Sequence, residues 1–398
     1  MVSIIEVTDK AQLRRFVDYP NELYKDVPQF VPATYGDDLS DWDRSKNPAF
    51  EYCDARCWLA MRDGEIVGRI GAIHSRKAND KWGANRLRFT QVDFIDDPEV
   101  SSALFRTVEA WAKDLNCTAV HGPLGFTDMD REGMLVEGFD RRSLFFTNYN
   151  APYYLEHLTR LGYRKDVDWI EYRITVPEPG GAEAERLHKL SEFILKRKHL
   201  HVATVHHKSE YGPFVRQVFE LVNAAYAPLY GVVELSDEQI ERYANKFIPL
   251  VDPDFVCFVV DEQDQLVAFG VTALDPSVAL KHSDGRLFPF GWAGVLNDLH
   301  HSDTLIMLLT AVRPDLQTEG INAVMMDHVC QSCNRHGVRF AETGPMLELN
   351  DHILAQWKRL EKEQHKRRRC FIKDLDHDVN AANAAAAQTE TPETESAE

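Results

Sequence analysis

Apolar residues along the chain follow two different spacings, which predict both strands and helices. Short alternating or continuous apolar runs predict strands at 57–61, 66–73, 87–94 and 304–312. Apolar residues three and four positions apart predict helices, and the clearest stripe consists of Val100, Leu104, Val108, Trp111 and Leu115. Because strands and helices alternate along the chain, the pattern predicts an α/β protein with a mixed sheet.

Local signals place turns and helix ends in the first half of the chain. Asp63-Gly64 between two apolar runs predicts a β-hairpin. Pro20 predicts the end of a first helix that begins near Lys10. A further helix is expected to begin at Asn150-Ala-Pro152 and to stop at Gly162. The polar stretch 26–48 is expected to be a long loop or a helical lid.

The pattern of the first half of the chain recurs in the second half. Residues 257–270 align without a gap with residues 57–70, and each stretch predicts a hairpin. Gly344-Pro345 similarly aligns with Gly122-Pro123, each after a helix and a short strand. These matches indicate an internal duplication. Short apolar hairpins can also resemble one another by chance.

The duplication divides the chain into two units and a tail. A Pro/Gly-rich linker at 177–181 predicts one unit at 1–178 and a second at 179–375. Residues 350–360 are expected to repeat the helix at 150–161 near the end of the second unit. The remaining residues, 376–398, are rich in Ala, Thr and Glu and are expected to be disordered.

Composition and charge exclude several classes of protein. The 398 residues carry a formal net charge of −18, which argues against non-specific binding of nucleic acid. No apolar run approaches the roughly 20 residues that span a bilayer, and the first residues lack the basic region of a signal peptide. The seven cysteines indicate a reducing compartment, so we expect a cytoplasmic protein. Scattered histidines and a lone Cys330-Gln-Ser-Cys333 pair predict no metal site.

Residues 312–322 form the most informative segment. They follow the apolar strand at 304–312 and precede a helical stripe made of Ile321, Met325, Val329 and Cys333. A strand that turns into a helix in this way directs free backbone N–H groups at a ligand over the helix N-terminus, which suits a pyrophosphate. Gly320 allows the backbone to approach such a ligand closely. An ordinary strand–helix turn is the alternative interpretation.

The segment resembles motif A of the GNAT acyltransferases, V-x-P-x-x-(Q/R)-x-x-G-(I/V/L)-(G/A), which binds the pyrophosphate of acyl-CoA. Five positions match, and they are Val312, Pro314, Gln317, Gly320 and Ile321. Asn322 and Glu319 depart from the motif. The resemblance implies transfer of an acyl group from acetyl-CoA or a longer acyl-CoA to an amine. It also implies cofactor contacts from Val312, Gln317, Thr318, Gly320, Ile321 and Asn322.

Other segments look like an uncharacterised bacterial family of tandem GNAT-like proteins, and this resemblance covers residues 1 to about 375. The segments that carry it lie at 47–51, 64–69, 94–99, 122–130 and 162–169. Tandem proteins of this kind commonly use one unit for the cofactor and the other for the acceptor. The first unit has carboxylates at 93–97 where motif A would lie, so we expect the second unit to hold CoA.

Candidate catalytic and acceptor residues follow from this arrangement. Glu342, near the end of the strand after the motif-A helix, is the expected base for the amine, and Asn350 precedes the last helix. The acidic loop and nearby aromatic residues of the first unit are expected to hold a cationic amine through His121, Asp128, Asp130, Glu132, Tyr149 and Tyr153. Calcium is not expected in this loop, because Phe139 stands where an EF-hand requires glutamate.

Three functional classes stay open at this stage. The first is an N-acyltransferase for a small amine or amino acid, active as a monomer or homodimer. The second is a non-catalytic binding module with the GNAT fold. The third is transfer from aminoacyl-tRNA, for which the basic run 366–369 could form a local groove. The same run could contact a phosphate of CoA, or it could be the solvated end of a helix.

Overall fold

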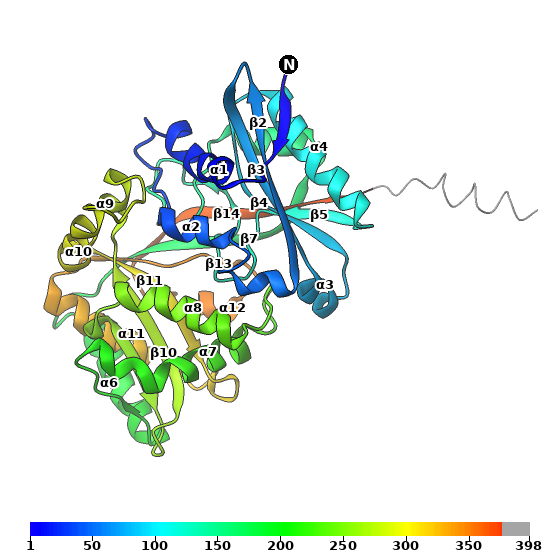
Figure 1. Ribbon diagram of the computed structural model, residues 1–398. Helices are drawn as coiled ribbons and strands as arrows, with labels where there is room; N and C mark the ends of the chain where they lie inside the picture. Colours follow the sequence, from blue (N-terminus) through cyan, green and yellow to red (C-terminus); the bar gives the residue numbers. More distant parts are fainter. Residues whose placement is uncertain (376–398) are drawn as a thin grey trace, which may run out of the picture.

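The computed structural model describes residues 1–375, so the predicted tail lies outside the described residues. The chain forms two lobes, with the first half of the sequence in one and most of the second half in the other (Figure 1). A single mixed sheet runs through both lobes in the order β1-β2-β3-β4-β5-β14-β7-β12-β11-β10-β9-β8, with β6 and β13 pairing beside it. This sheet, covered by helices, confirms the predicted α/β class.

The first lobe is built from seven strands and five helices. Its strands are β1 (Ser3–Glu6), β2 (Cys53–Arg62), β3 (Glu65–Ser75), β4 (Arg86–Phe94), β5 (Ala119–Gly122), β6 (Met134–Glu137) and β7 (Arg164–Thr175). Its helices are α1 (Lys10–Leu23), α2 (Tyr35–Asp41), α3 (Arg76–Trp82), α4 (Pro98–Asp114) and α5 (Tyr153–Arg160). The predicted lid at 26–48 therefore contains one short helix, α2.

The rest of the described chain supplies seven strands and seven helices. The strands are β8 (His201–Val202), β9 (Val256–Val260), β10 (Leu266–Leu274), β11 (Thr304–Val312), β12 (Phe340–Glu342), β13 (Met346–Leu347) and β14 (Lys362–Asp374). The helices are α6 (Ala182–Lys198), α7 (Gly212–Tyr226), α8 (Asp237–Phe247), α9 (Ser277–His282), α10 (Gly291–His301), α11 (Asn322–His336) and α12 (Asp351–Ala355).

The two halves repeat the same strand pairings. Strands β2 and β3 form an antiparallel hairpin, as do β9 and β10. Strand β4 pairs in parallel with β5, and β11 pairs in parallel with β12. The aligned hairpins and Gly-Pro segments therefore occupy equivalent places in the two lobes, as the internal duplication predicts.

The last strand crosses from the second half of the chain into the first lobe. Strand β14 pairs on one side with β5 and on the other with β7, while β7 also pairs with β12 and β13. Figure 1 shows β14, in red, lying between strands of the first lobe. This exchange joins the lobes through backbone hydrogen bonds, so that no open sheet edge is left between them.

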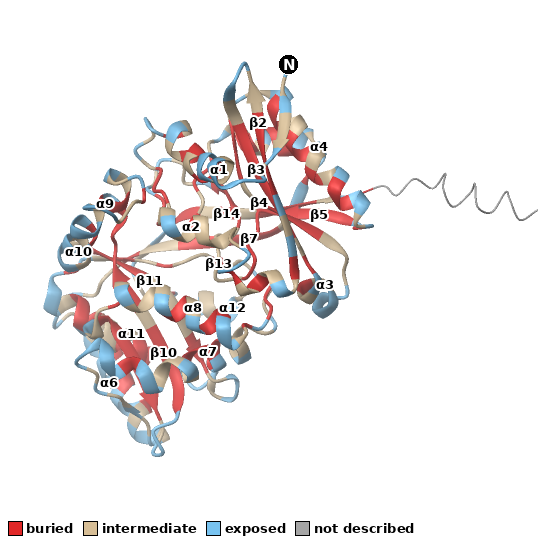
Figure 2. Cartoon of the chain, in the orientation of Figure 1, coloured by how far each residue is buried: buried red, intermediate tan, exposed pale blue. Residues whose placement is uncertain are grey.

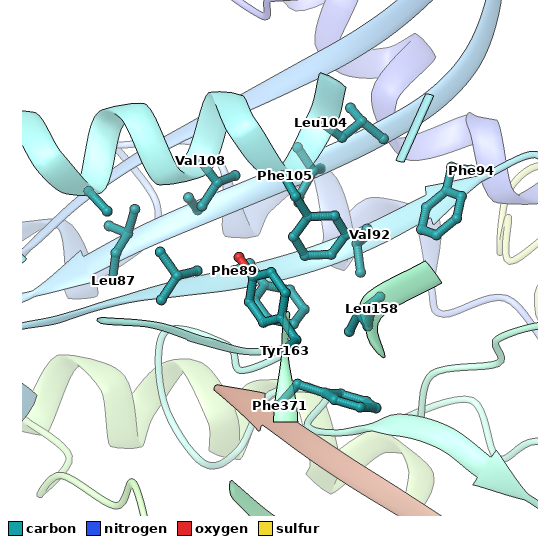
Figure 3. Close-up of a cluster of buried hydrophobic side chains, with 14 of the residues drawn as sticks. Leu87, Phe89, Val92, Phe94, Leu104, Phe105, Val108, Leu158, Tyr163 and Phe371 are labelled. Carbon is teal, nitrogen blue, oxygen red and sulfur yellow. The ribbon is translucent and has the colours of Figure 1, made fainter. Parts of the chain in front are cut away.

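The core of the first lobe forms where α4 packs on β4. Leu104, Phe105 and Val108 of α4 meet Leu87, Phe89, Val92 and Phe94 of β4, and Phe371 of β14 completes the cluster (Figure 3). All of these side chains are buried. The buried positions continue as a band along the sheet into the second lobe (Figure 2). The stripe predicted for α4 is therefore the core-facing side of that helix.

The prediction that Pro20 ends the first helix is wrong. Helix α1 continues to Leu23 with Pro20 inside it. Proline cannot donate to the carbonyl four residues earlier, which leaves the Phe16 oxygen without its helical partner. The Arg69 guanidinium donates to that oxygen at 2.7 Å, and its carbon lies 4.9 Å from the centre of the Phe16 ring. A long-range contact thus satisfies the carbonyl group that the proline exposes.

Two expectations near the end of the chain are also wrong. The predicted helix at 350–360 is only the short α12, because β14 begins at Lys362. The basic run 366–369 is not a helix end, since it lies within β14. Its residues alternate in burial: Lys366 and Arg368 are fully buried, whereas Arg367 and Arg369 are partly exposed.

Among residues 1–375, no helix combines the length and apolar character needed to cross a membrane.

Candidate functional site

The turn from β11 into α11 has the conformation that the sequence predicts. A short turn at Pro314–Leu316 follows β11, and α11 begins at Asn322. Gly320 has a φ of 80°, which favours glycine. Within the described residues, the backbone N–H groups of Gly320, Ile321 and Asn322 have no hydrogen-bond partner. The turn therefore presents free donors at the start of a 15-residue helix, as an anion site requires.

Basic residues of α6 lie beside this turn. The last turn of α6 carries Lys196, Arg197 and Lys198. Lys198 Nζ lies 2.6 Å from Glu319 Oε2, and this hydrogen bond lowers the pKa of the Glu319 carboxyl. Glu319, the acidic residue that departs from motif A, is thus paired with Lys198, which lies outside the motif.

A cavity begins at the turn and runs along β11. Strands β11 and β12 pair only over three residues, 304–306 with 340–342, so the edge of β11 beyond Ile306 does not pair with β12. The space beside this edge is a cavity of about 600 Å³. Its lining includes Val312, Gln317 and Asn322 of the predicted cofactor segment, together with Thr310. The predicted cofactor residues thus open onto a groove of the size that ligands use.

The cavity continues into a smaller one of about 200 Å³ between the lobes. The two share lining residues from three elements: Thr310 of β11, the end of α7 and the segment around α12. The residues in common are Tyr226, Leu229, Tyr230, Thr310, Leu347, Asn350 and Ile353. Together the two cavities form one path from the motif-A turn to the first lobe.

Two carboxylates from the acidic loop of the first lobe line the smaller cavity. They belong to Asp128 and Glu132, both predicted acceptor residues. Burial raises the pKa of Asp128 to about 6, and the neighbouring Asp130 adds to the shift. Burial and the charge of Asp128 raise the pKa of Glu132 well above its usual range. Glu132 Oε1 is buried without a hydrogen-bond partner in the described structure. A carboxylate that titrates near neutral pH is suited to accept a proton from an amine.

The other predicted catalytic residues lie in different surroundings. Glu342 Oε2 lies 3.2 Å from Lys366 Nζ, which in turn lies 3.1 Å from Glu171 Oε2. Burial raises the pKa of Glu342, and Lys366 opposes that shift. Glu342 is therefore one member of a buried ionic cluster and does not line either cavity. Asn350 lines both cavities and also caps α12, because its Oδ1 accepts from the Ile353 N–H at 3.2 Å.

Three further predicted acceptor residues make structural contacts. Asp130 accepts from the Phe126 N–H at 2.8 Å and from the Tyr243 hydroxyl at 3.1 Å, which shapes the acidic loop. Tyr149 packs against other aromatic rings, and Tyr153 donates to the Phe94 carbonyl. None of the three lines the path from the motif-A turn.

The first lobe has little space at the equivalent place. Trp42 lies against Gly71 of β3, and its Nε1 donates to Gln91 Oε1 of β4 at 3.0 Å. The cavity lined by Trp42 and Thr90 measures about 50 Å³. A bulky side chain thus occupies part of the surface that the second lobe leaves open.

His121, the remaining predicted acceptor residue, belongs to a separate polar cluster beside the larger cavity. His121 Nδ1 lies 3.0 Å from the Tyr230 hydroxyl, which donates to Asp166 Oδ2 and lies 3.6 Å from Cys370 Sγ. Burial lowers the pKa of His121 to about 4, so the imidazole is neutral at neutral pH. The members come from four distant segments, and no local sequence signal could have indicated this cluster.

Comparisons with known proteins place the chain among acyltransferase-like folds. Protein YghO of Escherichia coli strain K12 is 27% identical over 373 residues, covering 92% of this chain and 94% of that protein. The bacterial ceramide synthase of Caulobacter vibrioides is 26% identical over 302 residues, covering 74% of this chain and 76% of that protein. The chain matches no protein-family model.

Two solved structures share the architecture. A tandem GNAT protein from the clavulanic acid biosynthesis pathway superposes with a TM-score of 0.53 at 13% identity, covering 94% of this chain and 98% of that chain. A GCN5-related glucosamine N-acetyltransferase region of a fungal multi-domain β-N-acetylglucosaminidase superposes with a TM-score of 0.55 at 10% identity. It covers 94% of this chain and 38% of that chain.

Proposed function

We propose that this chain, which has the tandem GNAT fold, is an N-acyltransferase. In this proposal it moves an acyl group from acyl-CoA to a primary amine. One observation carries the proposal: a continuous path leads from the motif-A turn of the second lobe to Asp128 and Glu132 of the first lobe. The donor enters at one end, and the acceptor amine meets the carboxylates at the other.

The donor lies along the larger cavity. Its pyrophosphate accepts hydrogen bonds from the free N–H groups at 320–322. Lys198 and Arg197 at the end of α6 supply positive charge beside the turn. The pantetheine arm follows the unpaired edge of β11, where backbone groups beyond Ile306 can bond with its amides. This placement brings the thioester toward Thr310 and the smaller cavity.

Asp128 is the base in this proposal. The ammonium of the acceptor gives a proton to the Asp128 carboxylate, and the neutral amine attacks the thioester carbonyl. The C–N bond forms and the C–S bond breaks; the departing thiolate takes the first proton from Asp128, and the nitrogen releases its second proton to solvent. Burial raises the pKa of Glu132 well above its usual range, which favours the protonated form that can donate a hydrogen bond. Glu342 stays an untested prediction for the base.

The lining of the cavities favours an acceptor with an apolar chain. Much of the lining is aliphatic or aromatic, and it includes Leu229, Leu347, Ile353 and Trp357. Leu349, which lines the larger cavity, is 79% exposed. A ceramide is the amide of a fatty acid and a long-chain amino alcohol, and one relative carries the name of a ceramide synthase. We therefore propose a long-chain amino alcohol as acceptor, with a small amine or amino acid as the alternative.

Binding of the donor is tested by isothermal titration of the purified protein with acetyl-CoA and with a long-chain acyl-CoA below its micelle concentration. Micromolar binding is expected, and Gly320→Trp should abolish it. Gly212→Trp is the matched control, since Gly212 is exposed and has no neighbour within 4 Å of an added Cβ. If a folded wild-type protein binds neither thioester, the donor site is refuted and a non-catalytic binding module is favoured.

Turnover with different acceptors is tested by mass spectrometry of the amide product. Sphinganine, a short amino alcohol and a set of amino acids are each incubated with the protein and a long-chain acyl-CoA. The proposal expects an amide only with the long-chain amine, or at least a tenfold higher kcat/KM for it. Preference for an amino acid would overturn the acceptor class while leaving the donor site intact.

A further inference from the structure

The side chains of His121, Asp166 and Cys370 form a cluster that the proposed acyl transfer does not use. We propose that this cluster is a binding site for a thiophilic divalent transition-metal ion, with zinc as the expected occupant. The inference rests on these side chains and Tyr230 alone, so it stands or falls independently of the proposed function.

The ligand atoms already lie close together. The imidazole nitrogen, carboxylate oxygen and thiol sulfur of the three residues all lie within 4.8 Å of one another. His121 Nδ1 and Asp166 Oδ2 are 3.9 Å apart. Zinc bonds nitrogen and oxygen at about 2.0–2.2 Å and sulfur at about 2.3 Å, so tetrahedral ligands lie roughly 3–4 Å from one another. Small inward movements would therefore complete the ion's coordination.

The strand exchange brings the three ligands together. His121 lies on β5, Asp166 on β7 and Cys370 on β14, and β14 lies between the other two strands. The pairing of β14 with β7 shifts register between Cys370, opposite Val167, and Phe371, opposite Lys165. Asp166 is the residue left over in that shift. A β-bulge of this kind redirects a side chain, which here lies near Cys370.

The donor set selects the metal. An imidazole, a carboxylate and a thiolate together suit zinc and similar ions, whereas calcium and magnesium prefer oxygen alone. Within residues 1–375, no other group of three His, Cys, Asp or Glu side chains meets the same distance criterion. Cys330 and Cys333 belong to no such group of three among the described residues.

Tyr230 gives the site an opening and a fourth neighbour. Its hydroxyl lies 3.0 Å from His121 Nδ1 and 3.6 Å from Cys370 Sγ, and it donates to Asp166. Both Asp166 and Tyr230 line the larger cavity, so an ion can enter from there. When the ion binds, the Cys370 thiol loses its proton to solvent. The fourth position is taken by the Tyr230 oxygen or by water, and the ion then ties three first-lobe strands to the wall of the cavity.

Cobalt titration of the full chain, reduced and freed of metal with a chelator, tests the site. Co²⁺ bound to a thiolate gives a sulfur-to-cobalt charge-transfer band, and tetrahedral coordination gives intense visible d–d bands. We expect both at a stoichiometry near one, and their loss when Zn²⁺ is added. Cys370→Ser should remove the charge-transfer band, and His121→Gln should weaken Co²⁺ binding at least tenfold. Cys333→Ser, a matched buried cysteine of the second lobe, should leave both unchanged.

Each result decides the proposal. Circular dichroism and thermal melting establish that the variants are folded, and His121→Gln provides a second test if Cys370→Ser is unstable. A wild-type protein that shows no charge-transfer band overturns the inference, since the cluster would then be only a hydrogen-bonded network around Tyr230. A band that persists in Cys370→Ser but disappears in Cys333→Ser would overturn it as well.

Discussion

Lys198 Nζ lies 2.6 Å from Glu319 Oε2, and this contact places an anion and a cation together at the turn that we propose for the pyrophosphate. The carboxylate opposes a bound pyrophosphate, while the ammonium favours it. Removing the carboxylate should therefore raise the affinity for the donor, and removing the ammonium should lower it.

Glu319→Gln should tighten acyl-CoA binding by about two- to fivefold at low salt, and Lys198→Ala should weaken it by a similar factor, since exposed charges interact modestly and are screened. Calorimetry at two salt concentrations measures both changes, which should shrink as salt rises. Lys189→Ala on the same helix, which removes the exposed pair with Glu185, is the control. Equal affinity in all three variants would argue against pyrophosphate binding at this turn.

The rate of acyl transfer should depend on the ionisation of Asp128. Its pKa is raised to about 6, so the reactive carboxylate forms as the pH rises. We expect kcat/KM to increase between about pH 5 and pH 7 because of this group. Asp128→Asn should lower kcat by about 10²- to 10⁴-fold without changing acyl-CoA affinity. Asp140→Asn, at an exposed residue just after β6, should retain full activity. Full activity of Asp128→Asn would contradict this role for Asp128 and favour Glu342 as the base.

The same residue should make the folded protein less stable at high pH. A carboxyl whose pKa rises from 3.8 to about 6 on folding is easier to bury protonated than ionised. The stabilisation is complete below the unfolded pKa and is lost as the pH rises through about 6. Asp128→Asn should therefore raise the melting temperature at pH 8 more than at pH 5. A melting-temperature difference that does not change with pH would contradict the buried environment of this carboxylate.

A buried ionic cluster should hold the exchanged strand in place. Arg368 Nε lies 2.5 Å and Lys366 Nζ 3.1 Å from Glu171, which joins β14 to β7. Burial alone would raise the pKa of Glu171, but the two cations outweigh it and lower the pKa to about 2. Their support for the fold is present above the unfolded pKa of about 4.5 and is lost as the pH falls toward 2.

Glu171→Gln should lower the free energy of unfolding by about 3–5 kcal/mol, because it leaves the buried Arg368 without its carboxylate and Lys366 with Glu342 alone. Chemical denaturation at neutral pH measures the change. Glu363→Gln, on the neighbouring strand β14, removes an exposed partner of Arg141 and should cost under about 1 kcal/mol. Similar losses in the two variants would show that the buried cluster adds nothing beyond a surface ion pair.

Local signals in the sequence were enough to predict the strand, the turn and the helix at 304–336 of the second lobe. The turn at 312–322, the helix after it and the repeated hairpins each depend on neighbouring residues, because glycine conformation and apolar spacing act over a few positions. The tandem GNAT architecture expected from the motifs is confirmed by the fold. Pro20 does not end the helix, because Arg69, 53 residues after Phe16, donates to the carbonyl that the proline leaves without a partner.

The sequence by itself determined the α/β class, the two similar hairpins and the strand, turn and helix at 304–336. Only the tertiary structure decided which polar residues meet. Asp128 and Glu132 reach the path from motif A because the lobes pack together, and His121, Asp166 and Cys370 converge because β14 enters the first lobe. These contacts depend on the order and register of strands whose residues lie up to 249 positions apart in the sequence. The spacing of residues along a chain carries no information about strand order or register.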